Sequence, residues 1–325
     1  MPSLKEIKSR IASVNSTRKI TSAMKMVASS KLLHAQKMIE NMLPYETMLE
    51  HMLKTFLAAE AEAQFIYNQP RPVNRVALVV CSSNSSLCGG FNANIIRLMQ
   101  QTVAQYSSLG EKGVIIYPIG KKVAEAAARL HLPVAGDYSA MIDKPHVSDC
   151  INLARDLGLQ FSRGEVDRVE LIYHHFKSAG SQVLTRKTFL PIDVTEELQA
   201  DKERDLSSNI VTKEAQEYLK RRKRTRKGNN NGSLATAKPL NDNFIVEPDM
   251  TTVLAKLITK LAHLVIYTAL LDSIASEHAA RMVAMQTATD NADELLRQLN
   301  LQYNKSRQQA ITNELLDIVG GTVNA

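Results

Sequence analysis

The last part of the chain, residues 249–325, carries an apolar pattern that only a long helix can satisfy. Alternate steps of three and four residues from Leu254 land on apolar or small side chains almost as far as Ala310. A 3–4 repeat of this length is typical of a coiled-coil seam, whereas an ordinary globular helix shows a broader apolar stripe. The seam positions are Leu254, Leu257, Leu261, Leu264, Thr268, Leu271, Ala275, His278, Met282, Met285, Thr289, Ala292, Leu296, Leu299, Tyr303, Ser306 and Ala310.

This predicted helix has recognisable ends. Asp249 is suited to cap its start, and Gly320 and Gly321 are expected to stop it. Residues 249–319 contain neither proline nor glycine. At 1.5 Å per residue, an unbroken helix over this span would be roughly 100 Å long. We therefore expect it to project from any compact domain.

The first 68 residues contain no glycine and predict a second long helix. Ser3 and Glu6 form a capping box at its start. The seam slips in register near Ile20, Met24 and Val27, and Pro44 is expected to kink or loosen the helix. Each terminal helix is the natural partner of the other, so the pattern predicts a long antiparallel coiled coil. The seam residues before and after the slip are Leu4, Ile7, Ile11, Val14, Ala35, Met38, Met42, Tyr45, Leu49, Met52 and Phe56.

The charge is uneven. The chain has a formal net charge of +7, and Glu6 is the single acidic residue before position 40, against eight basic ones. These could form a solvated basic face, or a surface that meets a carboxylate-rich partner. The basic residues are Lys5, Lys8, Arg10, Arg18, Lys19, Lys25, Lys31 and Lys37.

The middle of the chain follows a different pattern, in which strands and helices alternate. This order favours an α/β sheet of Rossmann-like type, in which the last two strands are candidates for antiparallel pairing. The predicted strands are 75–81, 113–119, 168–173 and 183–192, and the predicted helices are 92–106, 121–130 and 149–161.

No catalytic, cofactor-binding or metal-ligating residue is predicted. The stretch from Leu87 to Asn92 lies where a phosphate loop would, but it matches neither G-x-G-x-x-G nor a Walker loop. Its two glycines are expected to let a helix start close to the sheet. Cys88 lacks the histidine signature of a cysteine nucleophile. His174 and His175 are expected to be surface histidines at a strand end.

Three cysteines, Cys81, Cys88 and Cys150, are an odd number without metal spacing and predict a reduced protein with buried thiols. The first residues lack the apolar core of a secretory leader. The longest apolar run, near residues 261–271, contains His263 and is too short to cross a bilayer. Any work at a membrane is therefore expected to be peripheral.

Residues 201–247 read as a charged insertion. Its basic run, residues 220–227, is followed by a Gly/Asn/Ser-rich tether, and a nucleic acid or an anionic lipid could bind it. The predicted division of the chain is thus a helix over 1–69, an α/β domain over 70–200, the insertion over 201–247 and a helix over 248–325.

Three stretches together resemble the γ subunit of F-type ATP synthases, as a bacterial type with a basic insertion. The first is Leu4–Val14 with Lys19–Ala28, and the second is Leu87–Asn92. The third is Ser276–Met285, followed by Ala288–Ala292 and by Tyr303–Leu315. The resemblance covers nearly the whole chain outside the insertion.

The resemblance implies a non-catalytic rotor shaft that couples proton flow to ATP synthesis or hydrolysis. Its implied partners are a ring of three α and three β subunits, the δ and ε subunits, and the c-ring of the membrane sector, without nucleic acid and without a cofactor. The implied location is the cytoplasmic face of the bacterial inner membrane. For the insertion, a lineage-specific contact or brake on rotation is one hypothesis, and unchanged coupling and ATPase activity after deletion of 203–240 would exclude it. The rival interpretation from the residues alone is a nucleic-acid-binding coiled-coil protein.

The motifs also imply contacts with the β subunits. Met24 and Lys25 on the first helix match such positions, as do Arg307, Gln308, Thr312 and Glu314 on the last. One departure lies before Leu87, where the family usually carries Asp-Arg-Gly and this chain has residues 84–86 as Asn-Ser-Ser. A salt bridge formed there in relatives is therefore not expected in this form.

Overall fold

The computed structural model describes residues 3–59, 67, 71–110, 113–192 and 245–323. The chain divides into two compact units. The end unit comprises residues 1–28 and 281–325, and the sheet unit comprises residues 29–280. Two long helices, α1 (Leu4–Ala59) and α8 (Met250–Val323), contribute to both units. Most of the predicted insertion, residues 201–244, lies outside the described residues.

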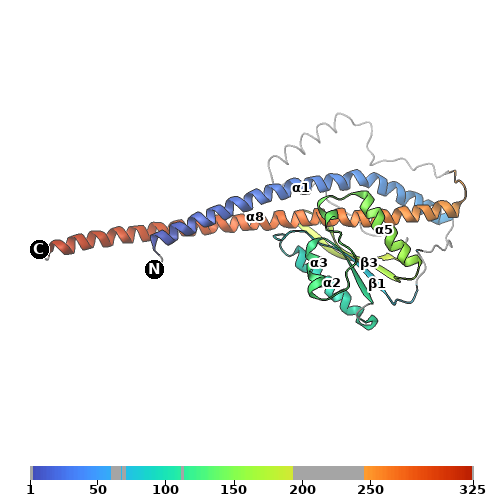
Figure 1. Cartoon of the computed structure of the whole chain (residues 1–325). Coiled ribbons are helices and arrows are strands. Elements are labelled where there is room, and N and C mark those ends of the chain that lie inside the picture. Colours follow the sequence, from blue (N-terminus) through green and yellow to red (C-terminus); the bar gives the residue numbers. More distant parts are fainter. Residues whose placement is uncertain (1–2, 60–66, 68–70, 111–112, 193–244, 324–325) are drawn as a thin grey trace, which may run out of the picture. The chain divides into compact units, whose positions relative to one another are not determined.

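The sheet unit contains a four-stranded sheet in the order β2-β1-β3-β4 (Figure 1). Strand β1 pairs in parallel with β2 and β3, and β3 pairs antiparallel with β4. The predicted α/β class and the antiparallel last pair are confirmed. The elements are β1 (Val76–Cys81), α2 (Phe91–Gln105), η2 (Ser107–Leu109), β2 (Val114–Ile119), α3 (Lys121–Arg129), α4 (Ala140–Asp143), α5 (Val147–Ser162), β3 (Arg168–Ser178) and β4 (Ser181–Leu190).

Helices cover both faces of this sheet, and alternation along β1 shows how. Val76, Leu78 and Val80 pack with residues of α2 and α3 in one apolar core. Strand side chains alternate between faces, so Ala77, Val79 and Cys81 point the other way, and they too are fully buried. A strand buried on both faces reads as a continuous apolar run, as this one does.

The same alternation corrects the prediction for the two histidines of β3, which are not surface residues. β3 continues to Ser178 because β4 pairs along its whole length. His174 is buried and stacks on Phe91 at the start of α2, with ring centroids 4.4 Å apart. His175 faces the other way, and its Nδ1 lies 2.7 Å from Oδ2 of the buried Asp272 on α8. The Ser276 hydroxyl of α8 donates to the His174 carbonyl oxygen at 3.2 Å.

On α8, every predicted seam position is buried or half-buried, so the 3–4 seam is confirmed. Asp249 caps the start by accepting the Thr252 amide at 2.8 Å. The predicted stop at Gly320 and Gly321 is wrong, because α8 continues to Val323. Glycine weakens a helix by about 1 kcal/mol relative to alanine, which disfavours the helix without forbidding it.

On α1, the predicted capping box forms in both directions between Ser3 and Glu6. The predicted register slip is wrong, because an unbroken 3–4 series is buried or half-buried from Ile7 to Phe56. It passes through polar and small residues, and Ile20 and Val27 are exposed instead. The helix also continues through Pro44 as a single element. The series is Ile7, Ile11, Val14, Arg18, Thr21, Lys25, Ala28, Leu32, Ala35, Ile39, Met42, Glu46, Leu49, Leu53 and Phe56.

One part of α8 is apolar enough, by length and composition, to qualify as a membrane span within the described residues. Half of that window is buried inside the protein. Residues 270–277 are buried without interruption, and they include Asp272 and Glu277. These eight residues are therefore packed inside the protein.

The glycine that permits a close approach to the sheet is Gly120. A Cβ at this position would lie 2.3 Å from the carbonyl oxygen of Ser82, and its φ of +112° is unfavourable for other residues. In the Cys88–Asn92 loop, Gly89 has a φ of +59°, whereas Gly90 has an ordinary φ of −78° and a Cβ there would make only an ordinary contact with Asn94. The tight helix start predicted at Gly89 and Gly90 is therefore found at α3.

The buried His174 makes stability depend on pH. Burial lowers the pKa of His174 from 6.5 to about 4. The unfolded chain therefore takes up a proton on this histidine at a higher pH than the folded chain. The contribution of neutral His174 to the free energy of unfolding is complete above pH 6.5 and is lost as the pH falls towards 4. Between pH 7 and 4.5, His174→Phe should lose roughly 2 kcal/mol less stability than the natural chain.

Urea unfolding followed by circular dichroism at both pH values measures this difference. His34→Phe, at an exposed position of α1, is the matched control and should retain the natural pH dependence. An equal pH dependence in all three proteins would contradict the assignment to His174.

Candidate functional site on the paired terminal helices

Three polar contacts join α1 to α8 in the end unit. Arg18 Nη1 lies 3.0 Å from Asp293 Oδ1, and the hydroxyls of Thr21 and Thr289 are 2.9 Å apart. Lys25 Nζ donates to Gln286 Oε1 at 2.8 Å. Positions rise along α1 as they fall along α8, so the helices run antiparallel, as predicted. We call these three contacts the polar ladder.

Four of the six residues in the polar ladder, namely Arg18, Thr21 and Lys25 of α1 and Thr289 of α8, occupy seam positions, where a coiled coil normally places apolar side chains. Polar seam residues reduce stability but fix the register, because any slip leaves hydrogen-bonding groups without partners. Gln286 is itself held, since its Nε2 donates to Asp290 Oδ1 at 2.7 Å. The Arg18–Asp293 pair is partly exposed, at 39% and 53% of the side-chain surface, so its own contribution is small.

α8 continues beyond the start of α1. Followed back along α1, the register of the polar ladder places Leu4 near Arg307, so the residues of α8 after that point have no partner turn on α1. The burial pattern agrees, because residues 311–316 are all exposed. Ile311, Leu315 and Leu316 are 48%, 58% and 63% exposed. This part of α8 is a single helix with apolar side chains on its surface.

The residues predicted to contact a partner fall into two groups in this unit. Arg307, Gln308, Thr312 and Glu314 are exposed at and beyond the end of the pairing. The second group, Met24 and Lys25, is half-buried and lies beside Gln286. At 1.5 Å per residue, Gln286 lies roughly 30 Å before Arg307 along α8. The structure thus gathers the first group at one end and places the second group apart from it.

In the first group, the Thr312 hydroxyl donates to the carbonyl oxygen of Gln308 at 2.9 Å, within the helix itself. In the second group, the Lys25 ammonium is already engaged by Gln286. The sequence indicated an available cation at Lys25, and the internal hydrogen bond could not be foreseen without the register.

The loop that departs from the family pattern is tied down by Asn84. Its Nδ2 donates to the Ser139 carbonyl and to Asp143 Oδ2, both at 2.8 Å. Its Oδ1 accepts the Lys121 amide at 3.0 Å, at the start of α3. A neutral side chain therefore joins the end of β1 to α3 and α4. Sequence reasoning missed this role, although the Asn84 substitution itself was the signal.

The thiols do not form a reactive centre. Cys88 is buried, and Asn92 Nδ2 lies 3.1 Å from its sulfur. Burial raises the pKa of both Cys81 and Cys150 to about 12, so both remain protonated at neutral pH. The predicted burial of the three cysteines is confirmed.

A second cluster that the sequence did not reveal fixes β4 on the sheet. Glu170 is fully buried on β3 and accepts two hydrogen bonds from Arg186 of β4, at 2.7 and 3.0 Å. The Tyr106 hydroxyl donates to the same carboxylate at 2.6 Å, and burial followed by this hydrogen bond raises the pKa of Tyr106. The available signal was a glutamate inside an otherwise apolar strand.

Comparison with known proteins agrees with the sequence motifs. The family model described as ATP synthase matches residues 3–324. The ATP synthase gamma chain of Phocaeicola vulgatus is 50% identical over 323 residues, which is 99% of this chain and 100% of the relative. That of Bacteroides thetaiotaomicron is 49% identical over 326 residues with the same coverage.

Solved structures share the fold at lower identity. A chain of the central stalk and c-ring of Tetrahymena thermophila mitochondrial ATP synthase is 24% identical, with a TM-score of 0.53, over 83% of this chain and 99% of that one. A chain of Euglena gracilis mitochondrial ATP synthase is 18% identical, with a TM-score of 0.55, over 98% and 93%. The match to the family model and the half-identical relatives of full length show that this chain belongs to the family of ATP synthase gamma chains, the rotor-shaft subunits of that enzyme.

Proposed function

We propose that this chain transmits torque from a proton-driven membrane ring to catalytic α and β subunits, one copy turning within three of each. The paired helices of the end unit carry the proposal, because the polar ladder holds two unlike helices in one register. Such a pair presents different surfaces in different directions. A shaft can drive a catalytic subunit between states only when it contacts those states differently.

The single-helix end of α8 supports a partner contact. Arg307, Gln308, Thr312 and Glu314 are exposed there, next to the exposed apolar residues of the same helix. We propose that these four residues meet the β subunits, and that Met24 and Lys25 form a second contact further along the end unit. The exposed basic residues of α1, such as Lys5 and Lys19, give this surface the charge that a carboxylate-rich partner requires.

We further propose that the chain supplies no catalytic group and acts at the cytoplasmic face of the bacterial inner membrane without crossing it. The protonated thiols of Cys81 and Cys150 and the engaged Cys88 support a non-catalytic role. The uninterrupted burial of residues 270–277 of α8 within the protein supports peripheral attachment. The nucleic-acid alternative depends on the basic residues of α1 and on the basic run of residues 220–227, and the second of these lies outside the described residues.

Native mass spectrometry of the full chain with α and β subunits from the same organism and Mg-ATP tests the assembly. We expect a complex of three α, three β and one copy of this chain. If the folded chain stays outside the ring, the rotor proposal fails, and a salt titration of nucleic-acid binding would be the next measurement.

Two possible roles of Lys25, holding Gln286 within the polar ladder and contacting a β subunit, can be separated by substitution. If Lys25 acts only by holding Gln286, Lys25→Ala and Gln286→Ala should reduce coupled ATP synthesis equally. If its ammonium meets a β subunit, as we propose, Lys25→Ala should reduce it several-fold and Gln286→Ala little, because a charge-assisted contact is worth about 1.5–3 kcal/mol. Proton-driven ATP synthesis in membrane vesicles is the measurement. Ser16→Ala, at an exposed position of α1, controls for substitution itself.

Charge at Arg307 tests the contact at the end of α8. Arg307→Glu should reduce coupled synthesis far more than Arg307→Lys, because a carboxylate reverses the interaction while lysine keeps the charge and loses only the planar fork. Lys305→Glu, also exposed and two residues away, is the matched control and should have a smaller effect. Equal losses for Arg307→Glu and Arg307→Lys would argue against a directional polar contact.

A further inference from the structure

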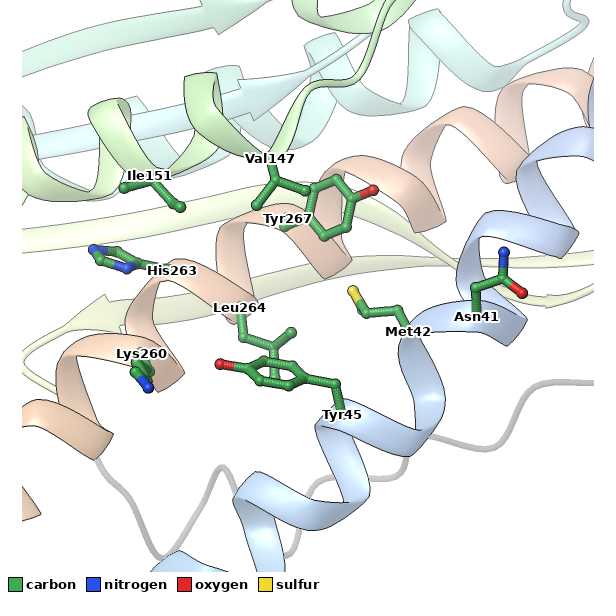
Figure 2. A pocket seen from close by; sticks show the side chains of 9 residues that line it. All are labelled: Asn41, Met42, Tyr45, Val147, Ile151, Lys260, His263, Leu264 and Tyr267. Carbon is green, nitrogen blue, oxygen red and sulfur yellow. The ribbon is translucent and has the colours of Figure 1, made fainter. Parts of the chain in front are cut away.

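A pocket of about 440 Å³ lies within the sheet unit, where three helices meet (Figure 2). Each helix contributes residues at helical spacing, so each presents one face to it. Val147 and Ile151 come from successive turns of α5, and His263 and Leu264 come from α8. Met42 reaches it from α1. Pockets of this size are typical of sites for small molecules, whereas a protein partner usually docks on a flatter surface.

The wall of this pocket is mostly apolar and incompletely covered. Leu264 is buried at its centre, and Met42 is half-buried. Val147 and Tyr45 remain 49% and 50% exposed. When an apolar group covers apolar side chains that are open to water in a concave site, the free energy of the system falls.

One end of the pocket is cationic. Figure 2 shows Lys260, His263 and the hydroxyl of Tyr45 towards the same end, with Asn41 at the other. The pKa of His263 is lowered, first by burial and then by the positive charge of Arg155, so a second cation lies nearby. None of the described residues that line the pocket is acidic. An anionic group at this end would meet positive charge without competition from a lining carboxylate.

We propose that this pocket binds a single-chain amphiphile with an anionic head, of which a long-chain carboxylate is the simplest. The tail lies between Leu264, Met42 and the α5 residues Val147 and Ile151. The carboxylate accepts hydrogen bonds from the Lys260 ammonium and the Tyr45 hydroxyl. Such a ligand joins α1, α5 and α8 and would stiffen the packing of the long helices on the α/β domain.

Isothermal titration of the full chain with dodecanoate, below its micelle concentration, tests the proposal. We expect saturable binding of one molecule per chain, and affinity that rises roughly fourfold per methylene from octanoate until the pocket is filled. Dodecanol, which has the tail without the charge, should bind roughly tenfold more weakly. Absence of saturable dodecanoate binding, or equal binding of dodecanol, would overturn the proposal.

Two variants locate the site. Lys260→Gln should weaken dodecanoate binding roughly tenfold and leave dodecanol unchanged. Lys256→Gln is the matched control, because Lys256 is exposed one turn earlier on α8 and does not line the pocket. Val147→Trp should fill the pocket and abolish binding of both compounds, with circular dichroism confirming the fold.

Unchanged dodecanoate affinity in both Lys260→Gln and Val147→Trp would place binding elsewhere and reject this site. A protein partner would give another result: Val147→Trp would block assembly with the α and β subunits or the membrane ring, while dodecanoate would fail to bind the free chain. That result would assign the pocket to a subunit interface and overturn the proposal.

Discussion

The need to cover an apolar seam on each terminal helix governs this structure. Neither α1 nor α8 could leave its seam in water, because helices gain most of their stability from tertiary packing of the apolar face. Antiparallel pairing covers both seams at once and joins the first helix of the chain to the last. In the sheet unit, α8 also packs on the sheet, so residues 270–277 are buried on all sides. The α/β domain is thereby built on a helix that belongs to the coiled coil as well.

In the polar ladder, side chains that fix the register of the two helices occupy positions where apolar side chains would give more stability. An apolar seam tolerates sliding, because one leucine substitutes for another with little loss. Arg18, Thr21 and Lys25 tolerate it less, since a displacement of one turn removes their partners on α8. A shaft that transmits torque requires a fixed register more than it requires maximum stability. The ladder lies in the end unit, the unit in which we place the partner contacts.

Much of the fold could be predicted from the sequence, and the errors have physical causes. The α8 seam was predictable because its residues are apolar or small in an unbroken series. The α1 seam was mispredicted between Ile20 and Val27, and again at Tyr45, which is exposed while Glu46 is buried. Both errors arise because hydrophobicity does not reveal a seam position that holds a polar side chain. The histidines were misplaced because strand β3 was ended too early, and only the pairing with β4 reveals its length. Partner contacts came from family motifs, since exposure alone does not distinguish them from other surface residues.

The single-helix end of α8 has a consequence for the life of the chain outside its complex. An isolated helix is marginally stable in water, and this one also carries exposed Ile311, Leu315 and Leu316. A free copy therefore presents a marginally stable helix end and an exposed apolar surface, which are features that chaperones and proteases recognise. In the proposed complex, enclosure of this end by partner subunits would cover the apolar side chains and hold the helix, so assembly would protect the chain. Copies made in excess of their partners are the ones most exposed to degradation.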